Sequence, residues 1–251
     1  MVTVRHQPPV AAGRIEDFRR IRSRAAERKG GEDVLAGLLP RVATPDELAG
    51  IPDARILSEM TRRIFSAGFA WSVIDKKWPG FEAAFLGFDP LRLTFQPPEF
   101  WDALTVDDRI VRHGAKIMSV ARNAHFILEV ANEHGSFGRF LADWPATDQL
   151  GLLSVLSKRG SRLGGNTGQY LLRFLSKDSY MLSRDVVRCL RDAGLDVAEP
   201  PTSKRDRTRI QQQFNAWAAE TKLPYTHLSR ICAMSIGENH PAEQLRAYME
   251  D

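Results

Sequence analysis

The sequence has 251 residues, 43% of them hydrophobic, which suffices for the core of one large domain or of one domain with an extension. Lysine and arginine total 35 against 31 aspartates and glutamates, and the net charge of +4 fits a polyanionic partner without requiring one. The two cysteines, Cys189 and Cys232, exclude a disulfide framework and a four-thiolate zinc site. No run of eighteen apolar residues and no signal-peptide core occurs, so we expect a reducing, cytoplasmic location.

The first thirty residues predict a basic amphipathic helix. Its apolar side chains recur at helical spacing, and Gly30 and Gly31 end the pattern. The apolar positions are Ile15, Phe18, Ile21 and Ala25, and the basic ones are Arg14, Arg19, Arg20, Arg22, Arg24, Arg28 and Lys29. We predict that residues 1–45 form a basic helical extension and that residues 46–251 form the main domain.

From residue 54 onward the pattern is one helix after another. No segment alternates with period two for long enough to predict a strand, so the fold class is expected to be all-α. Apolar stripes occur in four sets: Ile56, Leu57, Met60, Ile64 and Phe65; Ile110, Gly114, Ile117, Ala121, Ala124 and Leu128; Leu152, Val155 and Leu156; and Ile210, Phe214 and Trp217. A C-terminal pair of helices is expected around residues 202–219, which contain the last of these stripes, and 225–236.

Two blocks of sequence resemble one family of DNA repair enzymes. Residues 65–71 read FSAGFAW, residues 76–77 read KK, and residues 81–90 read FEAAFLGFDP. This order resembles the F-x-A-G-x-x-W, K-K, F-x-x-A-F-x-G-F-D-P signature of the 3-methyladenine DNA glycosylase I family. Residues 110–117, IVRHGAKI, followed by Asn123 and Ala124, are similar to the family's I-x-R-x-x-x-K-I and N-A helix. The resemblance implies a helix-hairpin-helix DNA glycosylase fold, with two helical lobes around a base-binding cleft.

A glycine-rich segment indicates where a DNA phosphate would bind. Residues 163–168, LGGNTG, lie between two apolar helical patterns, and the backbone amides that open the second helix would point outward with the positive end of the helix dipole behind them. Nearby cations add sequence-independent attraction. The predicted DNA-binding residues are Lys158, Arg159, Arg162, Gly164, Gly165, Asn166, Thr167 and Gly168. Taken by itself, the segment is better explained as an ordinary αα-hairpin, and the signature upstream is what favours phosphate binding.

The family resemblance also implies a catalytic aspartate just beyond the hairpin. In the best register that position holds Ser183, and Asp185 follows two residues later. Asp185 is the candidate catalytic residue, stabilising the positive charge that develops on the deoxyribose or orienting the attacking water. The alternative is a capped helix, with Ser183 as the N-cap and Asp185 in the first turn. Bifunctional relatives carry a hairpin lysine where this chain has Thr167, so the resemblance implies a monofunctional enzyme.

The predicted base-binding residues are Trp71, Phe65, Phe69, Arg63 and Glu59. The family pairs a tryptophan that stacks on the flipped base with a glutamate eight residues earlier; Trp71 fits the first, but Arg63 stands at the second. If Arg63 faces the site, it would repel a cationic base by about 4 kcal/mol at about 4 Å and an effective dielectric of about 20. That repulsion exceeds the roughly 1–3 kcal/mol expected from stacking. Alternatively, Arg63 and Glu59 pair on the outer face of their helix.

No metal or other cofactor is expected. The family binds a structural zinc through two cysteines and two histidines, but its C-terminal His-x-x-x-Cys is replaced here by Asp185 and Cys189, and no cysteine precedes Cys189. The six histidines show no ligand spacing.

The resemblance therefore implies a monofunctional DNA glycosylase of base excision repair that removes an alkylated or otherwise damaged base such as 3-methyladenine. The expected partner is double-stranded DNA with a flipped base, the expected state is a monomer, and no membrane is involved. A non-catalytic DNA-binding or lesion-recognition protein is the alternative, favoured by the loss of the acid before Trp71 and of the in-register aspartate. A helical protein-interaction module is a third hypothesis, for which the glycine-rich hairpin would be unnecessary.

Overall fold

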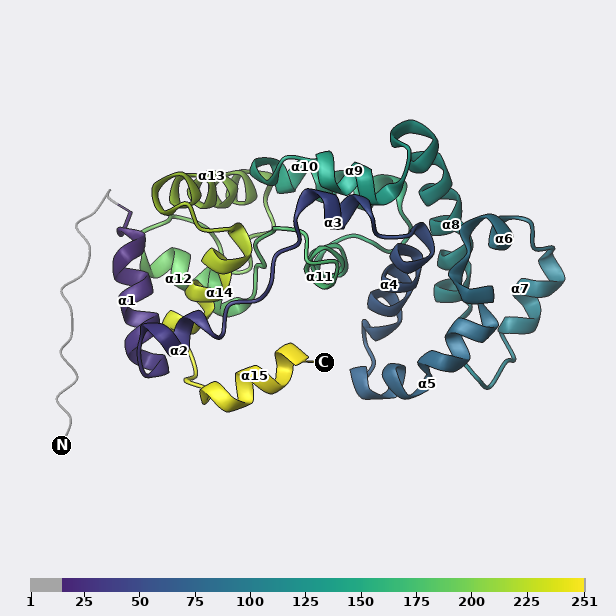
Figure 1. The fold of residues 1–251 in the computed structure, drawn as a ribbon, viewed down its shortest axis with the longest axis horizontal. Coiled ribbons are helices and arrows are strands. Elements are labelled where there is room, and N and C mark those ends of the chain that lie inside the picture. The colour runs from purple at the N-terminus through teal and green to yellow at the C-terminus, as the bar shows by residue number, and fades with distance from the viewer. Residues whose placement is uncertain (1–14, 251) are drawn as a thin grey trace. The chain divides into compact units, whose positions relative to one another are not determined.

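A computed structural model describes residues 15–250, and the side chains of residues 15–246. Arg14, named above, and His6, one of the six histidines, lie outside the described residues. All regular structure within the described range is helical, so the prediction of an all-α fold is confirmed (Figure 1). By their mutual contacts the residues group into two units: the terminal unit, residues 1–40 with 180–251, and the central unit, residues 41–179. The predicted division into an extension, residues 1–45, and a main domain, residues 46–251, stays a prediction.

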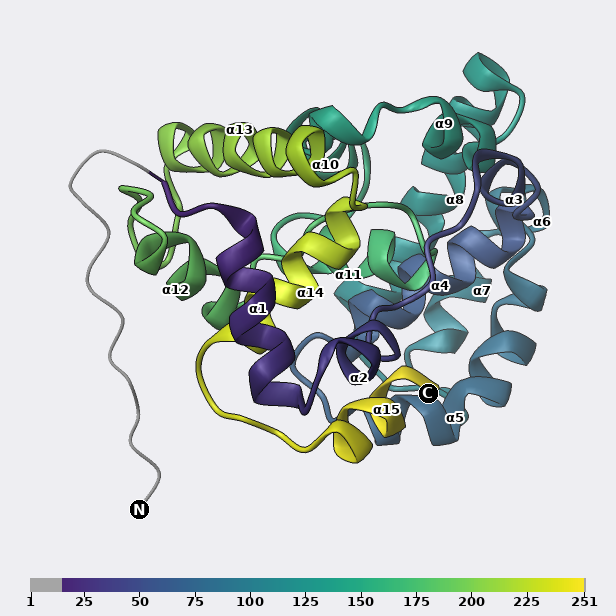
Figure 2. The ribbon, with the colours of Figure 1, turned by 60° about the vertical axis from the view of Figure 1, so that its left-hand side comes forward.

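The terminal unit is built around the predicted basic helix. Phe18, Ile21 and Ala25 are fully buried, and the Phe18 ring lies 5.1 Å from that of Trp217. Helix α1 lies alongside α14 (Figure 2) and ends at Gly30, whose φ of 93° suits a residue without a side chain. The helices of this unit are α1 (Phe18–Lys29), α2 (Glu32–Ala36), α12 (Arg184–Asp192), α13 (Lys204–Thr221), α14 (Tyr225–Ser235) and α15 (Ala242–Glu250).

Several basic side chains of α1 are engaged within the terminal unit. Arg24 forms an ion pair with the buried carboxylate of Glu16, at 3.3 Å. Arg28 donates hydrogen bonds to the carbonyls of Met234 and Gly237, at 3.0 and 2.7 Å. These cations therefore stabilise the unit itself.

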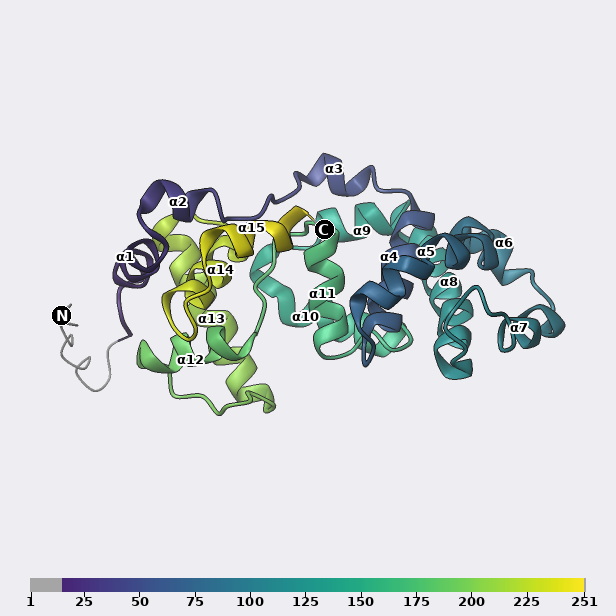
Figure 3. The ribbon, with the colours of Figure 1, turned by 90° about the horizontal axis from the view of Figure 1, so that it is seen from below.

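The central unit contains the segments that carry the family resemblance. Helix α4 packs against α8 and α11 (Figure 3), with Ile56, Leu57 and Met60 fully buried. The elements are α3 (Pro45–Ala49), α4 (Asp53–Ser66), α5 (Trp71–Ala84), the 3-10 turn η1 (Leu86–Phe88), α6 (Pro90–Thr94), α7 (Pro98–Leu104), α8 (Gly114–His134), α9 (Phe137–Asp143), the 3-10 turn η2 (Ala146–Asp148), α10 (Gln149–Arg159) and α11 (Asn166–Phe174).

The LGFDP part of the sequence signature is a turn followed by a helix start. Gly87 adopts a φ of 69°, and the Asp89 carboxylate accepts a hydrogen bond from the amide of Arg92 at 3.1 Å, which caps α6. The Phe88 ring is buried and stacks on Trp78 at 5.4 Å. These signature residues thus shape the backbone and the core of the central unit.

Candidate functional site

Helix α8 holds the turn that leads to Trp71. The buried side chain of Lys116 donates to the carbonyls of Phe65 and Ala67, at 3.1 and 2.6 Å, and its ammonium lies 4.7 Å from the centre of the Phe69 ring. Desolvation lowers the pKa of Lys116, and the charge of Arg162 adds to the effect. The lysine of the I-x-R-x-x-x-K-I block is therefore a residue that positions the site, a role that its sequence did not indicate.

Trp71 belongs to an aromatic cluster with Tyr170 and Phe174, which lie one turn apart on α11. The Trp71 ring meets Tyr170 edge-on at 5.4 Å and lies 5.5 Å from Phe174. The three residues keep 41%, 37% and 38% of their surfaces exposed. Since large aromatic side chains are usually buried, this partly open group is a candidate surface for stacking a planar ligand.

Arg63 lies beneath this aromatic cluster. The central carbon of its guanidinium is 3.7 Å from the centre of the Phe174 ring and 5.0 Å from that of Trp71, and only 5% of the residue is exposed. Desolvation lowers the pKa of Arg63, while the negative charge of Glu59 opposes the shift. Glu59 and Arg63 do form the i,i+4 ion pair of the alternative, at 3.7 Å, but the pair does not lie on the outer face, because both residues are buried.

The charges around Arg63 are incompletely paired. One Glu59 oxygen lies 2.9 Å from an Arg55 nitrogen, whereas the other lies 3.7 Å from Arg63, too far for a hydrogen bond. That second oxygen, Oε2, is buried without a hydrogen-bond partner, and so are Nε and Nη1 of Arg63. Buried polar groups of folded proteins are nearly always satisfied, so this unpaired set calls for a partner, which a water molecule or a ligand would supply.

The two phenylalanines predicted to line the base site differ in exposure. Phe69 is 39% exposed beside Lys116. Phe65 is fully buried and packs edge-on against Phe81 at 4.8 Å. Direct contact of either side chain with a base stays a prediction. Phe65 lies in the core of the central unit, whereas Phe69 is partly accessible.

The predicted hairpin joins α10 to α11 through a tight turn. Gly165, at the start of α11, has a φ of 60°, and a Cβ added there would meet no atom within 4 Å. A Cβ on Gly168 would lie 2.6 Å from the carbonyl oxygen of Leu163, so this position requires glycine for close packing. The exposed face of Gly165 leaves the backbone accessible to a ligand.

Asn123 clamps this turn from α8. Its side-chain oxygen accepts a hydrogen bond from the amide of Ser161 at 2.7 Å, and its side-chain nitrogen donates to the carbonyl of the same residue at 3.1 Å. Asn123 is fully buried. The N-A pair of the sequence therefore supports the hairpin, which its position in the motif did not reveal.

The cations near the hairpin are in different situations. Arg159 donates to both oxygens of Glu133, at 2.7 and 2.9 Å, and lies over the Phe126 ring. Lys158 and Arg162 are exposed. Lys158 and Arg162 are consequently better candidates for phosphate contact than Arg159.

Asp185 lies in the terminal unit, in the first turn of α12. The Ser183 hydroxyl caps that helix by accepting from the amide of Val186 at 3.3 Å, as the capped-helix alternative predicts. The Asp185 carboxylate packs against Gly237, where an added Cβ would lie 2.6 Å from Oδ1. Capping by Ser183 does not preclude chemistry at Asp185, whose catalytic role stays a prediction.

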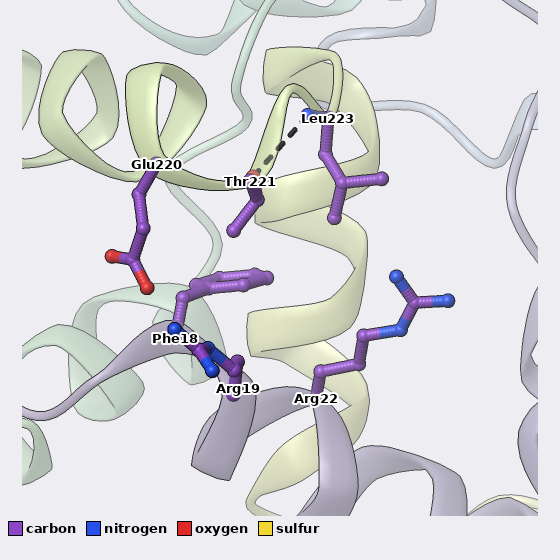
Figure 4. Close-up of a pocket in the computed structure, with 6 residues that line it drawn as sticks. All are labelled: Phe18, Arg19, Arg22, Glu220, Thr221 and Leu223. Atoms are coloured by element: carbon purple, nitrogen blue, oxygen red, sulfur yellow. Dashed lines mark hydrogen bonds between the residues drawn. The ribbon is translucent and has the colours of Figure 1, made fainter.

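Apart from Asp185, the terminal unit contains none of the predicted site residues. Figure 4 shows a pocket lined by Phe18, Arg19, Arg22, Glu220, Thr221 and Leu223. The sulfur of Cys189 lies 3.3 Å from the Ser235 hydroxyl oxygen, and Cys232 is also buried. Among the residues with described placement, no group of three or more His, Cys, Asp or Glu side chains could hold a metal ion. Across the described residues of both units, no helix is long and apolar enough to cross a membrane.

Comparisons with known proteins agree with the sequence motifs. The sequence model of the methyladenine glycosylase family matches residues 50–152. DNA-3-methyladenine glycosylase 1 of Escherichia coli (strain K12) is 30% identical over 103 residues, which cover 40% of this chain and 55% of that protein. The chain thus matches about half the length of this relative.

Similar solved structures carry the same family name. A variant of 3-methyladenine DNA glycosylase I in complex with 3-methyladenine is 23% identical, with a TM-score of 0.45 over 50% of this chain and 77% of that one. The Staphylococcus aureus enzyme is 20% identical, with a TM-score of 0.46 over 57% and 83%. The family match and the Escherichia coli relative agree with the predicted resemblance: residues 50–152 are similar to the methyladenine glycosylase family.

Proposed function

We propose that this protein is a monofunctional DNA glycosylase, which flips a damaged base out of double-stranded DNA and hydrolyses its N-glycosidic bond. The observation that carries the proposal is the position of Trp71. This residue fits the family's stacking tryptophan, and it stands partly exposed in an aromatic cluster. Extruding a base costs a few kcal/mol, least for a damaged base that already pairs poorly, and stacking on an aromatic side chain offsets roughly 1–3 kcal/mol.

The hairpin between α10 and α11 would bind the DNA backbone. The first amides of α11 have no acceptor within their own helix, and the open face of Gly165 allows a phosphate to approach them. Lys158 and Arg162 would add attraction that depends on salt concentration but not on base sequence. Asn166, Thr167, Gly164 and Gly168 complete the proposed contact, and Arg159 would contribute only by exchanging Glu133 for phosphate.

Water would be the nucleophile of the reaction. Thr167 occupies the position at which bifunctional relatives carry a lysine, so no covalent enzyme–sugar adduct is expected and the product would be an abasic site. We assign to Asp185 the role of stabilising the cationic sugar or orienting water. An alkylated purine would leave readily, because its ring is already positive and departs as a neutral base.

A non-catalytic lesion-recognition protein is the second candidate. Arg63 at the glutamate position and the use of Ser183 as a helix cap favour it. Both candidates would bind DNA through the hairpin, so binding alone does not separate them.

An excision assay distinguishes the two. Duplexes that each contain one defined lesion are incubated with the full chain, and released base and abasic sites are counted. The first proposal expects release of at least one base, abolished by Trp71→Ala. Lesion-selective binding with no release from any duplex would instead support the second candidate.

A further inference from the structure

Arg63 presents hydrogen-bond donors that nothing in the protein satisfies. Nε and Nη1 are buried and unpaired, while Nη2 lies 3.7 Å from Glu59. A buried arginine normally has its donors occupied, because a missing hydrogen bond to a charged group is costly. The unpaired donors lie against the Trp71 and Phe174 rings, where the family relationship places the flipped base.

The charge of this site is wrong for a cationic base. Arg55 and Arg63 flank the single carboxylate of Glu59, so the three groups together carry one positive charge. Glu59 already pairs closely with Arg55, at 2.9 Å. A positively charged alkylated purine on Trp71 would therefore meet net repulsion, whereas an acceptor atom would meet unused donors.

We propose, resting on the glycosylase function above, that this site recognises a neutral base whose edge carries hydrogen-bond acceptors, with Arg63 as the donor to that edge. Hypoxanthine, whose edge offers a carbonyl oxygen and ring nitrogens, and uracil, which offers carbonyl oxygens, are bases of this class. Arginine is the side chain most often paired with a purine edge that offers carbonyl and ring-nitrogen acceptors. A site built around such a bond rejects ligands that cannot form it.

The same contact would assist the reaction. When the bond between C1′ and the nitrogen of a neutral base breaks, its electron pair moves to the base, which departs as an anion. Water adds its oxygen to C1′, and the proton that it releases passes through solvent to the departing base. A positive charge beside the base stabilises the developing anion, a contribution that a cationic alkylated base would not need.

Access to Arg63 requires a small movement. Phe174 covers the guanidinium at 3.7 Å and is itself 38% exposed. Rotation of this surface side chain would uncover Arg63 without unfolding a helix, since rotamer changes of exposed residues are fast. The base would then stack on Trp71 and direct its edge toward the uncovered guanidinium.

The test compares excision from duplexes containing hypoxanthine, uracil or 3-methyladenine by the wild type and by Arg63→Met, Arg63→Lys and Arg63→Glu. Arg62→Met is the control, because Arg62 is the neighbouring arginine of α4 but pairs with Asp75 and lies over Trp78, outside the aromatic cluster. Thermal melting establishes that each variant is folded. The wild type is expected to remove hypoxanthine or uracil at least tenfold faster than 3-methyladenine. Arg63→Met should lose at least tenfold on the preferred base, Arg63→Lys should lose less, and Arg63→Glu should reverse the preference.

A preference of the wild type for 3-methyladenine, or equal activity of wild type and a folded Arg63→Met, would overturn the inference. Faster excision of every base by Arg63→Met would also overturn it, since Arg63 would then only obstruct the site. If the wild type releases no base at all, the proposed function fails. The affinity of the protein for the same duplexes then tests whether Arg63 recognises the base. Tenfold tighter binding of the hypoxanthine duplex than of an undamaged one, lost in Arg63→Met but kept in Arg62→Met, would support recognition by Arg63. Equal affinities would reject it.

Discussion

The guanidinium of Arg63 lies 3.7 Å from the centre of the Phe174 ring, although 111 residues separate the two in the sequence. Helix α4 brings the charge and helix α11 brings the ring, and the same α11 begins at the hairpin proposed to bind phosphate. A base stacked on Trp71 would lie beside Tyr170 and Phe174 of α11, and a phosphate bound at Gly165 would lie at the start of the same helix.

Trp71→Ala should slow excision at least about 100-fold, while its affinity for undamaged duplex stays within about twofold of that of the wild type. Stacking acts only after the base has left the DNA helix, and the phosphate contacts are made by other residues. Excision kinetics and fluorescence anisotropy measure the two quantities. Phe95→Ala is the control, since Phe95 is 78% exposed and outside the aromatic cluster. Equal loss of binding and excision in a folded Trp71→Ala protein would show that the flipped base is bound elsewhere.

Gly165→Val should weaken binding to damaged and undamaged duplex alike, by about tenfold or more. A β-branched residue disfavours the φ of 60°, and its side chain would occupy the open space in front of the first amides of α11. Gly135→Val is the control, because Gly135 also has a positive φ, of 87°, but ends α8. Anisotropy titrations at several salt concentrations test this, and unchanged affinity of a folded Gly165→Val protein would remove the hairpin from the proposed interface.

Asn123→Ala should lower the free energy of unfolding by about 1–3 kcal/mol. The change removes two hydrogen bonds to Ser161 and leaves backbone groups in the turn without their partner. Urea denaturation of Asn123→Ala measures the loss, with Asn132→Ala, an exposed asparagine of the same helix, as the control. Equal stability of the two variants would mean that the clamp contributes nothing.

The lowered pKa of Lys116 predicts a specific pH dependence of the free energy of unfolding. Burial lowers its pKa in the folded protein below the ordinary lysine value of 10.5, so between the two pKa values the unfolded chain binds more protons. The free energy of unfolding contributed by Lys116 should therefore rise as the pH increases through the folded pKa towards 10.5. The difference in stability between wild type and Lys116→Met, measured by denaturation across the alkaline range, isolates this effect from other lysines. A difference that stays constant or falls with pH would contradict the assignment.

Much of the secondary structure could be predicted from local patterns in the sequence. The stripe of Ile56, Leu57 and Met60 does form a buried face of α4, and Ile210, Phe214 and Trp217 do face the interior from α13. Gly30 ends α1 as expected. Helical periodicity and the glycines that end helices are properties of neighbouring residues, so they can be recognised without knowing what the helices pack against. The start of α8 was less clear, because Ile110 continues the apolar spacing but precedes the helix, which begins at Gly114.

The sequence by itself also determined the resemblance to the family, because the FSAGFAW and FEAAFLGFDP segments place their residues at fixed spacings along one chain. Only the tertiary structure decided what surrounds Trp71. In the sequence, Tyr170 and Phe174 belong only to the apolar helical pattern that follows the glycine-rich segment, and the direction of Arg63 is undetermined. Their meeting depends on how α4, α5 and α11 pack, which is set by the summed burial of many distant side chains and is encoded in no local spacing. The same packing buries Arg63 and leaves two of its nitrogen donors unpaired.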